Sequence, residues 1–203
     1  MRVVIDDRTY DYVEIGLDKY DFLLKLEEMK PAQVISFLTD APLEEIKKAP
    51  FADVKFVSQM VKSQFYQTYN NTPLELTYTH NGVHYGLIIP SKISFEEWVN
   101  LEVMMASAPL DYALVAAHLY KPLRSDKQGE DRELWDYSLD ECQTRAQNEF
   151  KDFPVRIFNS ALFFFTTFVM EYTQNILSSM ETSKTEKTLP KDPKNKETAN
   201  NQQ

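Results

Sequence analysis

Residues 74–89, with the sequence LELTYTHNGVHYGLII, decide the class of fold. Two runs of apolar and β-branched residues flank Asn81-Gly82, a dipeptide that favours the positive φ angles of a type I′ turn. The twist of that turn matches the twist of two antiparallel strands, so the stretch predicts a β-hairpin. In this hairpin we expect His80 to pair with Val83, and His84 to pair with Thr79.

Helical patterns follow the hairpin. Ser94 and Glu97 have the spacing of a capping box, in which the Ser94 hydroxyl accepts from the backbone N–H of Glu97, and the Glu97 carboxylate accepts from that of Ser94. Ser138 and Glu141 have the same spacing further along the chain. We expect helices at about residues 94–106, 109–121, 138–150 and 152–177.

The first part of the chain, residues 1–66, shows the same order of hairpin and helices. Val3–Ile5 and Tyr10–Ile15 predict the two arms of a short hairpin, with the polar residues Asp6-Asp7-Arg8 between them. Prolines at positions 31, 42 and 50 then divide residues 17–65 into four predicted helices. The polar, turn-rich residues 67–73 are interpreted as a linker.

The C-terminal residues 178–203 differ in composition from the rest of the chain. They contain almost no apolar residue, so they cannot bury enough surface to offset the entropy of ordering, and we expect them to be disordered. The predicted fold is α+β and predominantly α-helical. It has two hairpin-plus-helices units, residues 1–66 and 74–177, and a disordered C-terminal tail.

Charge and composition weigh against several classes of function. The formal net charge is −9, and an acidic surface repels nucleic-acid phosphates, so binding of nucleic acid by a basic face is disfavoured. The longest apolar stretch, residues 155–170, is shorter than the ~20 apolar residues of a membrane-spanning helix. A single cysteine and the absence of a long apolar run at the N-terminus indicate a reducing, intracellular compartment.

The residues that could carry chemistry form no recognisable catalytic, cofactor-binding or metal-binding motif. His80 and His84 are four residues apart, but side chains alternate along a strand, so the two imidazoles should point to opposite faces and cannot share a metal ion. Cys142 and His118 could form a nucleophile and a base, although acidic neighbours would raise the pKa of the thiol. We therefore expect Cys142 to be an ordinary surface or half-buried thiol, and the protein not to be an enzyme.

The last predicted helix contains the candidate protein interface. At ~100° per residue, most of its apolar residues fall on one face, which we expect to pack on the protein's own core. Phe163 and Met170 lie seven residues apart on the opposite, polar face. Two large apolar side chains there predict contact with a partner or with a second copy of the chain. Packing against another helix of the same chain is the alternative.

Short motifs also occur in a characteristic order. The first half has Leu17-x-x-Tyr20-x-x-Leu23-Leu24. After the hairpin, the second half has Ile93-Ser94-x-x-x-Trp98-Val99, then Ala116-Ala117-His118-Leu119-Tyr120-Lys121-Pro122-Leu123, and then Phe153-Pro154-Val155 followed by Ala161-Leu162-Phe163-Phe164-Phe165. Over residues 10–177 this order resembles small tailed-bacteriophage proteins of the tail-assembly-chaperone or minor virion type.

The resemblance implies a role in building a phage particle. Under it we expect a tail-assembly-chaperone-like protein that binds tail or portal-region proteins in the host cytoplasm. The alternative is a structural or internal component of the finished virion, such as a neck, portal-associated or cargo protein. An enzyme or nucleotide-binding regulator is a third hypothesis, which requires polar groups that converge only in the folded chain. The resemblance assigns no functional residue, because its motifs occupy core positions.

Overall fold

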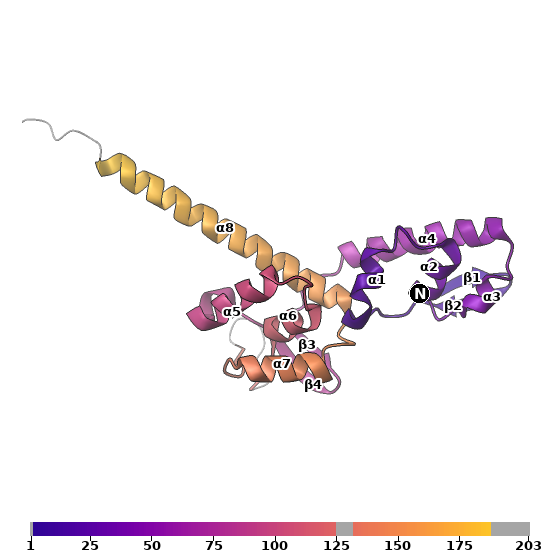
Figure 1. Ribbon diagram of the computed structural model, residues 1–203, viewed down its shortest axis with the longest axis horizontal. Coiled ribbons are helices and arrows are strands. Elements are labelled where there is room, and N and C mark those ends of the chain that lie inside the picture. Colours follow the sequence, from indigo (N-terminus) through magenta and orange to yellow (C-terminus); the bar gives the residue numbers. More distant parts are fainter. Residues whose placement is uncertain (1, 125–131, 188–203) are drawn as a thin grey trace, which may run out of the picture. The chain divides into compact units, whose positions relative to one another are not determined.

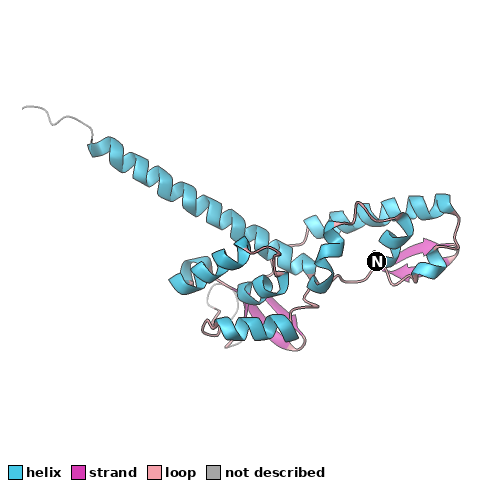
Figure 2. Cartoon of the chain, viewed as in Figure 1, coloured by secondary structure: helices cyan, strands magenta, loops and turns pink. Residues whose placement is uncertain are grey.

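The computed structural model describes residues 2–124 and 132–187, with side chains described as far as residue 175. The chain divides into two units, Met1–Phe165 and Thr166–Gln203. Among the described residues, the strands form one sheet of two strands and one sheet of three, both antiparallel, and helices make up most of the remainder (Figure 1, Figure 2). The chain is therefore α+β and predominantly α-helical, as the sequence predicted.

The N-terminal half of the first unit follows the predicted order of a hairpin and four helices. Prolines 31, 42 and 50 lie at or just before the starts of three helices, because a proline is tolerated only in the first turn. Helices α2 and α4 pack together and contribute six buried apolar residues: Val34, Ile35, Leu38, Val54, Val57 and Val61. The elements are β1 (Arg2–Ile5), β2 (Arg8–Asp11), η1 (Leu17–Lys19), α1 (Tyr20–Leu24), α2 (Pro31–Leu38), α3 (Leu43–Ile46) and α4 (Phe51–Asn70).

The first hairpin is shorter than predicted. Its turn is formed by Asp6 and Asp7, whose φ angles of 49° and 60° lie in the left-handed region that aspartate tolerates better than most residues. Strand β2 ends at Asp11, so the expected arm through Ile15 is too long. The physical reason is that the chain changes partner, because the N–H of Val13 donates to the carbonyl of Leu38 at 3.2 Å.

Helix α4 is longer than predicted and reaches Asn70, so residues 67–70 of the expected linker are helical. The polar residues that suggested a linker instead satisfy the end of the helix. Asn71 Nδ2 donates to the carbonyl oxygen of Gln67 at 2.7 Å. Such side-chain bonds satisfy backbone carbonyls that have no partner within the last turn of a helix.

The C-terminal half begins with the hairpin predicted around Asn81-Gly82. Strands β3 and β4 have the predicted register, with His80 opposite Val83 and Thr79 opposite His84. Asn81 and Gly82 have φ angles of 49° and 79°, as a type I′ turn requires. The elements of this half are β3 (Thr77–His80), β4 (Val83–Leu87), η2 (Pro90–Lys92), α5 (Phe95–Ala106), α6 (Tyr112–Leu119), β5 (Tyr120–Pro122), α7 (Leu139–Asn148) and α8 (Val155–Lys187).

Strand β5 was not predicted from the sequence. A helix was expected to continue as far as the residue before Pro122, but α6 ends at Leu119 and the next residues pair with β4. A proline disfavours the helical conformation in the residue before it, so Lys121 is extended. In β5 Lys121 lies opposite Gly86 of β4. The strand thereby places a lysine inside the C-terminal half.

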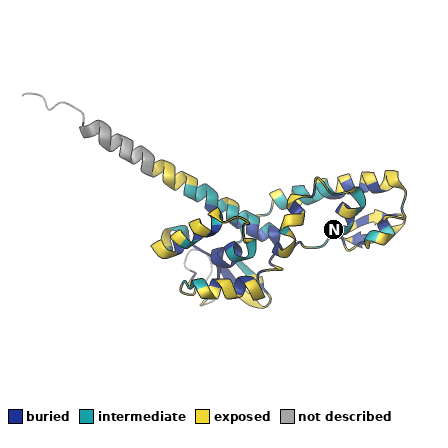
Figure 3. Cartoon of the chain, in the orientation of Figure 1, coloured by how far each residue is buried: buried dark blue, intermediate teal, exposed yellow. Residues whose placement is uncertain are grey.

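Large aromatic side chains form the core of the C-terminal half. Tyr85, Tyr120, Phe150, Phe153 and Phe158 are each less than 2 % exposed. The ring centroids of Phe150 and Phe153 lie 4.8 Å apart in a stacked pair. Figure 3 shows the buried residues in dark blue at the centre of this half. The core holds the strands and helices that position the charged residues of the candidate site.

Backbone hydrogen bonds join the two halves of the first unit. The N–H of Leu17 donates to the carbonyl of Phe153 at 3.1 Å, and the N–H of Val155 donates to that of Ile15 at 2.9 Å. Gly16 makes this approach sterically feasible, since a Cβ atom there would lie 2.8 Å from the Cα of Asp152. The two halves are therefore joined by backbone hydrogen bonds as well as by the connecting residues 71–76.

Helix α8 continues past its expected end near Leu177 and is helical to Lys187. The rest of the predicted disordered tail, residues 188–203, lies outside the described residues. None of the helices in the described part of the chain combines the length and the apolar character that crossing a bilayer requires.

Candidate functional site

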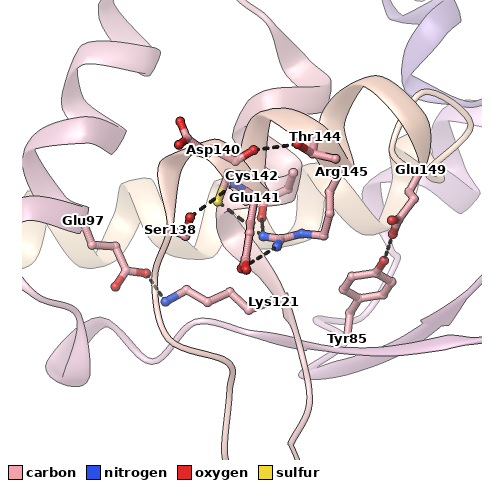
Figure 4. A network of polar contacts seen from close by, with 11 residues as sticks. Tyr85, Glu97, Lys121, Ser138, Asp140, Glu141, Cys142, Thr144, Arg145 and Glu149 are labelled. Carbon is pink, nitrogen blue, oxygen red and sulfur yellow. Dashed lines mark hydrogen bonds and ion pairs between the residues drawn. The ribbon is translucent and has the colours of Figure 1, made fainter.

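The candidate site lies in the C-terminal half, where Glu97 departs from its predicted role. The Ser94 hydroxyl accepts from the N–H of Glu97 at 3.1 Å, as the capping box predicted. The Glu97 carboxylate is 3 % exposed and lies 2.6 Å from Nζ of Lys121, so the capping residue is also one half of a buried ion pair (Figure 4). The contact lacks the alignment of a hydrogen bond.

Lys121 lies in β5, the strand that was not predicted from the sequence. It is 7 % exposed, and its ammonium lies 5.4 Å from the centre of the Tyr137 ring, over the face of the aromatic system. A cation above an aromatic ring is attracted by the electrons of the ring, and the attraction strengthens where water is excluded. The lysine therefore has two partners in the interior, a carboxylate and an aromatic face.

Arg145 connects α7 to the end of α6. Its side chain is buried, and Nη2 donates to the carbonyl oxygen of Ala117 at 2.9 Å and to Sγ of Cys142 at 3.3 Å. Nη1 lies 4.0 Å from a carboxylate oxygen of Glu141 (Figure 4). The guanidinium thus links two helices in the interior.

The structure buries both members of the Cys142 and His118 pair. Cys142 is 1 % exposed, not a surface or half-buried thiol as predicted, and burial raises the pKa of its thiol. His118 is fully buried, and burial, assisted by the positive charges of Lys121 and Arg145, lowers its pKa to about 4. At neutral pH the thiol of Cys142 is protonated and the imidazole of His118 is uncharged. Both side chains are buried, so neither is exposed to a substrate in solution.

His118 also has an unusual environment for an imidazole. Its ring packs edge-on against Tyr137 with 5.0 Å between the centroids, in a fully buried position. Burial removes the water that would solvate a charged imidazolium, so the uncharged ring is favoured.

His80 and His84 lie on opposite faces of the hairpin, as the register predicted. His80 is 8 % exposed, and its Nε2 lies 2.8 Å from the carbonyl oxygen of Glu149 and 3.1 Å from a carboxylate oxygen of Asp152. His84 is exposed and contacts the Thr79 hydroxyl at 2.8 Å through Nδ1. Across the described residues no cluster of three or more metal-ligating side chains was found.

A cleft of about 440 Å³ opens beside the Glu97–Lys121 pair. Three of its charged residues are nearly buried: Glu97, Lys121 and Arg132 are 3 %, 7 % and 6 % exposed. Arg132 Nε donates to the carbonyl of Leu87 at 2.8 Å, which fixes the guanidinium against the sheet. This cleft could not be predicted from the sequence, because its residues come from three separate segments of the chain.

A second feature is an apolar stripe on α5, formed by Phe95, Val99 and Val103. These residues are 82 %, 36 % and 62 % exposed. Their spacing of four residues places them in one line, while Leu101 and Met104 of the same helix are buried. Helix α5 thus has two apolar faces, and the four-residue spacing of Phe95, Val99 and Val103 is the signal in the sequence that corresponds to the exposed one.

The predicted interface residues of α8 are both exposed. Phe163 is 74 % exposed and Met170 is 58 % exposed. The structure thus gives three candidate features, namely the charged cleft, the α5 stripe and the two α8 residues. The chain matches no protein-family model, no curated protein and no solved structure, so these features are interpreted from the chain's own residues.

Proposed function

We propose that this chain is a protein-binding assembly factor of a tailed bacteriophage, with a role like that of a tail-assembly chaperone. Its partners are structural proteins of the same phage, from the tail or the portal region, and it acts in the host cytoplasm. The phage context rests on the resemblance in the order of sequence motifs. The observation that carries the protein-binding role is the exposed apolar stripe of α5.

The composition of the stripe fits a protein partner. Scattered exposed apolar residues are normal, but aligned ones are typical of interaction sites. Burying such a side chain fully contributes roughly 1.5–3 kcal/mol, so covering the three residues together would favour a contact. At ~100° per residue, the exposed Glu102 and Glu96 border the stripe on its two sides. We infer a partner surface with an apolar groove and a rim of lysine or arginine.

The test is complementation of a phage that lacks this gene, with tailed particles counted by electron microscopy. Phe95→Ser with Val103→Ser should melt at the parent temperature and reduce the yield of tailed particles at least about tenfold, since truncation of interface anchors costs ~2 kcal/mol or more. The matched control is Phe51→Ser with Phe56→Ser, two residues of α4 that are 74 % and 68 % exposed. Equal yields from the stripe variant and the parent would overturn the proposal.

Phe163 and Met170 offer a second, independent surface for the same function. Phe163→Ser with Met170→Ser should leave the melting temperature unchanged and lower the affinity for a partner or for a second copy of the chain. A fall in stability of about 2–5 kcal/mol would instead show that the two residues belong to a core. Urea unfolding together with sedimentation of the variant distinguishes these outcomes.

The alternative function is that of a structural or internal component of the virion. Both roles use protein contacts, so they differ in whether the chain remains in the finished particle. Mass spectrometry of purified virions separates them. An assembly factor is absent from the particle or far below one copy, whereas a neck, portal-associated or cargo protein is present in fixed number.

A further inference from the structure

The charged cleft of the C-terminal half has the features of a ligand site that is distinct from the protein-binding surfaces. Its charged walls come from the first turn of α5, from β5 and from the segment after residue 131. Removing an ion from water costs several kcal/mol, and apolar residues of similar size would avoid that cost. Three nearly buried charges at one cleft are therefore more than packing requires.

Lys121 and Arg132 provide the positive charge of the cleft. Lys121 carries three N–H donors, of which Glu97 occupies the direction nearest to its carboxylate. Arg132 is oriented by its bond to Leu87. In the described chain the charged lining consists of three cations and three anions, namely Lys92, Lys121, Arg132, Glu96, Glu97 and Asp136. Of the three that are nearly buried, two are cations and one is an anion.

The N-terminus of α5 adds to this potential. Ser94, Glu96 and Glu97 line the cleft, so the first backbone N–H groups of a 12-residue helix lie beside it. These groups carry a partial positive charge that favours anions. One of these N–H groups, that of Glu97, already donates to Ser94 Oγ. Asp136 opposes the effect only weakly, because its side chain is 89 % exposed and pairs with Arg124, and Glu96 is exposed as well.

Apolar and aromatic residues also line the cleft. Ile89, Ile93, Leu134 and Trp135 line it, and Trp135 is 47 % exposed. A volume of about 440 Å³ is within the range of sites that hold small molecules. The lining thus combines nearly buried charged groups with apolar and aromatic ones, which matches a ligand with an anionic head and an apolar body.

We propose that this cleft binds a small organic anion, a carboxylate or a phosphate ester with an aromatic or apolar body. The anionic head lies toward Lys121 and Arg132, and the body lies against Ile93 and Trp135. Glu97 limits the affinity, because its carboxylate repels the head and competes for Lys121. The site therefore responds in opposite directions to the loss of its acidic and its basic residue.

Isothermal titration calorimetry of the full chain tests the proposal with three probes: benzoate, phenyl phosphate and the uncharged benzyl alcohol. At least one anion should bind saturably with one site per chain, and benzyl alcohol should not. Binding of benzoate alone identifies a carboxylate ligand, and binding of phenyl phosphate alone identifies a phosphate ester. If neither anion binds, or if benzyl alcohol binds as tightly as the anions, the proposal is overturned.

Two variants connect such binding to the cleft. Glu97→Gln keeps the shape of the side chain and should tighten anion binding several-fold. Glu97→Gln combined with Lys121→Met leaves no unpaired charge from this pair and should weaken binding about tenfold relative to Glu97→Gln, the size of one charged hydrogen bond. Lys47→Met, at an exposed lysine that directly follows α3, is the control for net charge. Equal affinities for all four proteins would show that the anion binds elsewhere and would overturn the assignment.

Discussion

The two halves of the first unit share an order of elements and differ in what they bury. Among the described residues, the buried polar side chains of the N-terminal half are the uncharged Thr39 and Ser58. Those of the C-terminal half all have ionisable groups: His80, Glu97, His118, Lys121, Arg132 and Arg145. The shared order of a hairpin and helices thus does not determine which polar side chains are buried. Because its buried polar groups are ionisable, the C-terminal half is where we expect a ligand site.

The largest effect that would test this comparison is the removal of Lys121. Lys121→Met leaves the Glu97 carboxylate buried without its cation, which should lower the free energy of unfolding by about 3–5 kcal/mol. Adding Glu97→Gln removes the unpaired charge and should recover most of the loss. Urea unfolding of both variants measures these changes.

The N-terminal half supplies the control for that experiment. Lys62 and Glu27 form the same type of pair at 2.5 Å, but the Glu27 side chain is 66 % exposed. Lys62→Met should cost less than about 1 kcal/mol, because exposed ion pairs contribute little. If the two lysine variants lose the same stability, the buried charges do not distinguish the halves.

A smaller effect concerns pH. The folded pKa of His118 is lowered to about 4, whereas an unfolded histidine titrates near 6.5. Between these values the unfolded chain binds a proton that the folded chain does not, so stability falls as the pH falls from 6.5 to 4. The loss contributed by this group reaches roughly 3 kcal/mol at the acidic end. The three histidines of the chain, at positions 80, 84 and 118, all belong to the C-terminal half.

His118→Phe isolates this contribution, since phenylalanine keeps an aromatic ring beside Tyr137 and cannot be protonated. Urea unfolding at pH 7 and at pH 4.5 should show a smaller loss of stability for the variant than for the parent. Carboxylates titrate in both proteins and cancel in the comparison. Equal losses in parent and variant would mean that folding does not lower the pKa of His118.

The sequence predicted those features that depend on neighbouring residues. The register at Asn81-Gly82, the proline-bounded helices and the N-caps at Ser94 and Ser138 follow from local geometry, and the structure has them. The exposed positions of Phe163 and Met170 match the polar face to which the helical wheel assigned them. Their role in an interface stays a prediction.

The charged site could not be predicted in the same way. A capping box describes Glu97 by its distance from Ser94 and contains no information on Lys121, which is 24 residues further along the chain. Pro122 disfavours a helical conformation at Lys121, but the three-residue strand β5 exists through its pairing with β4, which no local pattern specifies. Only tertiary contact brings the two charges together, and only tertiary contact makes their burial visible.

The smallest expected effect compares the two hairpin turns. In the second hairpin Gly82 has a φ of 79°, and a Cβ atom there would meet nothing within 4 Å. Gly82→Ala therefore adds no steric clash with neighbours and exposes the backbone preference alone, which should cost about 1–2 kcal/mol. Urea unfolding measures this cost.

The first hairpin makes its turn without glycine, since Asp7 has a φ of 60°. Asp7→Gly relieves the strain of a side chain in the left-handed region, but it also increases the entropy of the unfolded chain, and the two effects nearly cancel to about 0.5 kcal/mol or less. A clear gain in stability from Asp7→Gly would show that the first turn is strained. In that case the two hairpins would differ in their backbones as well as in the interiors that follow them.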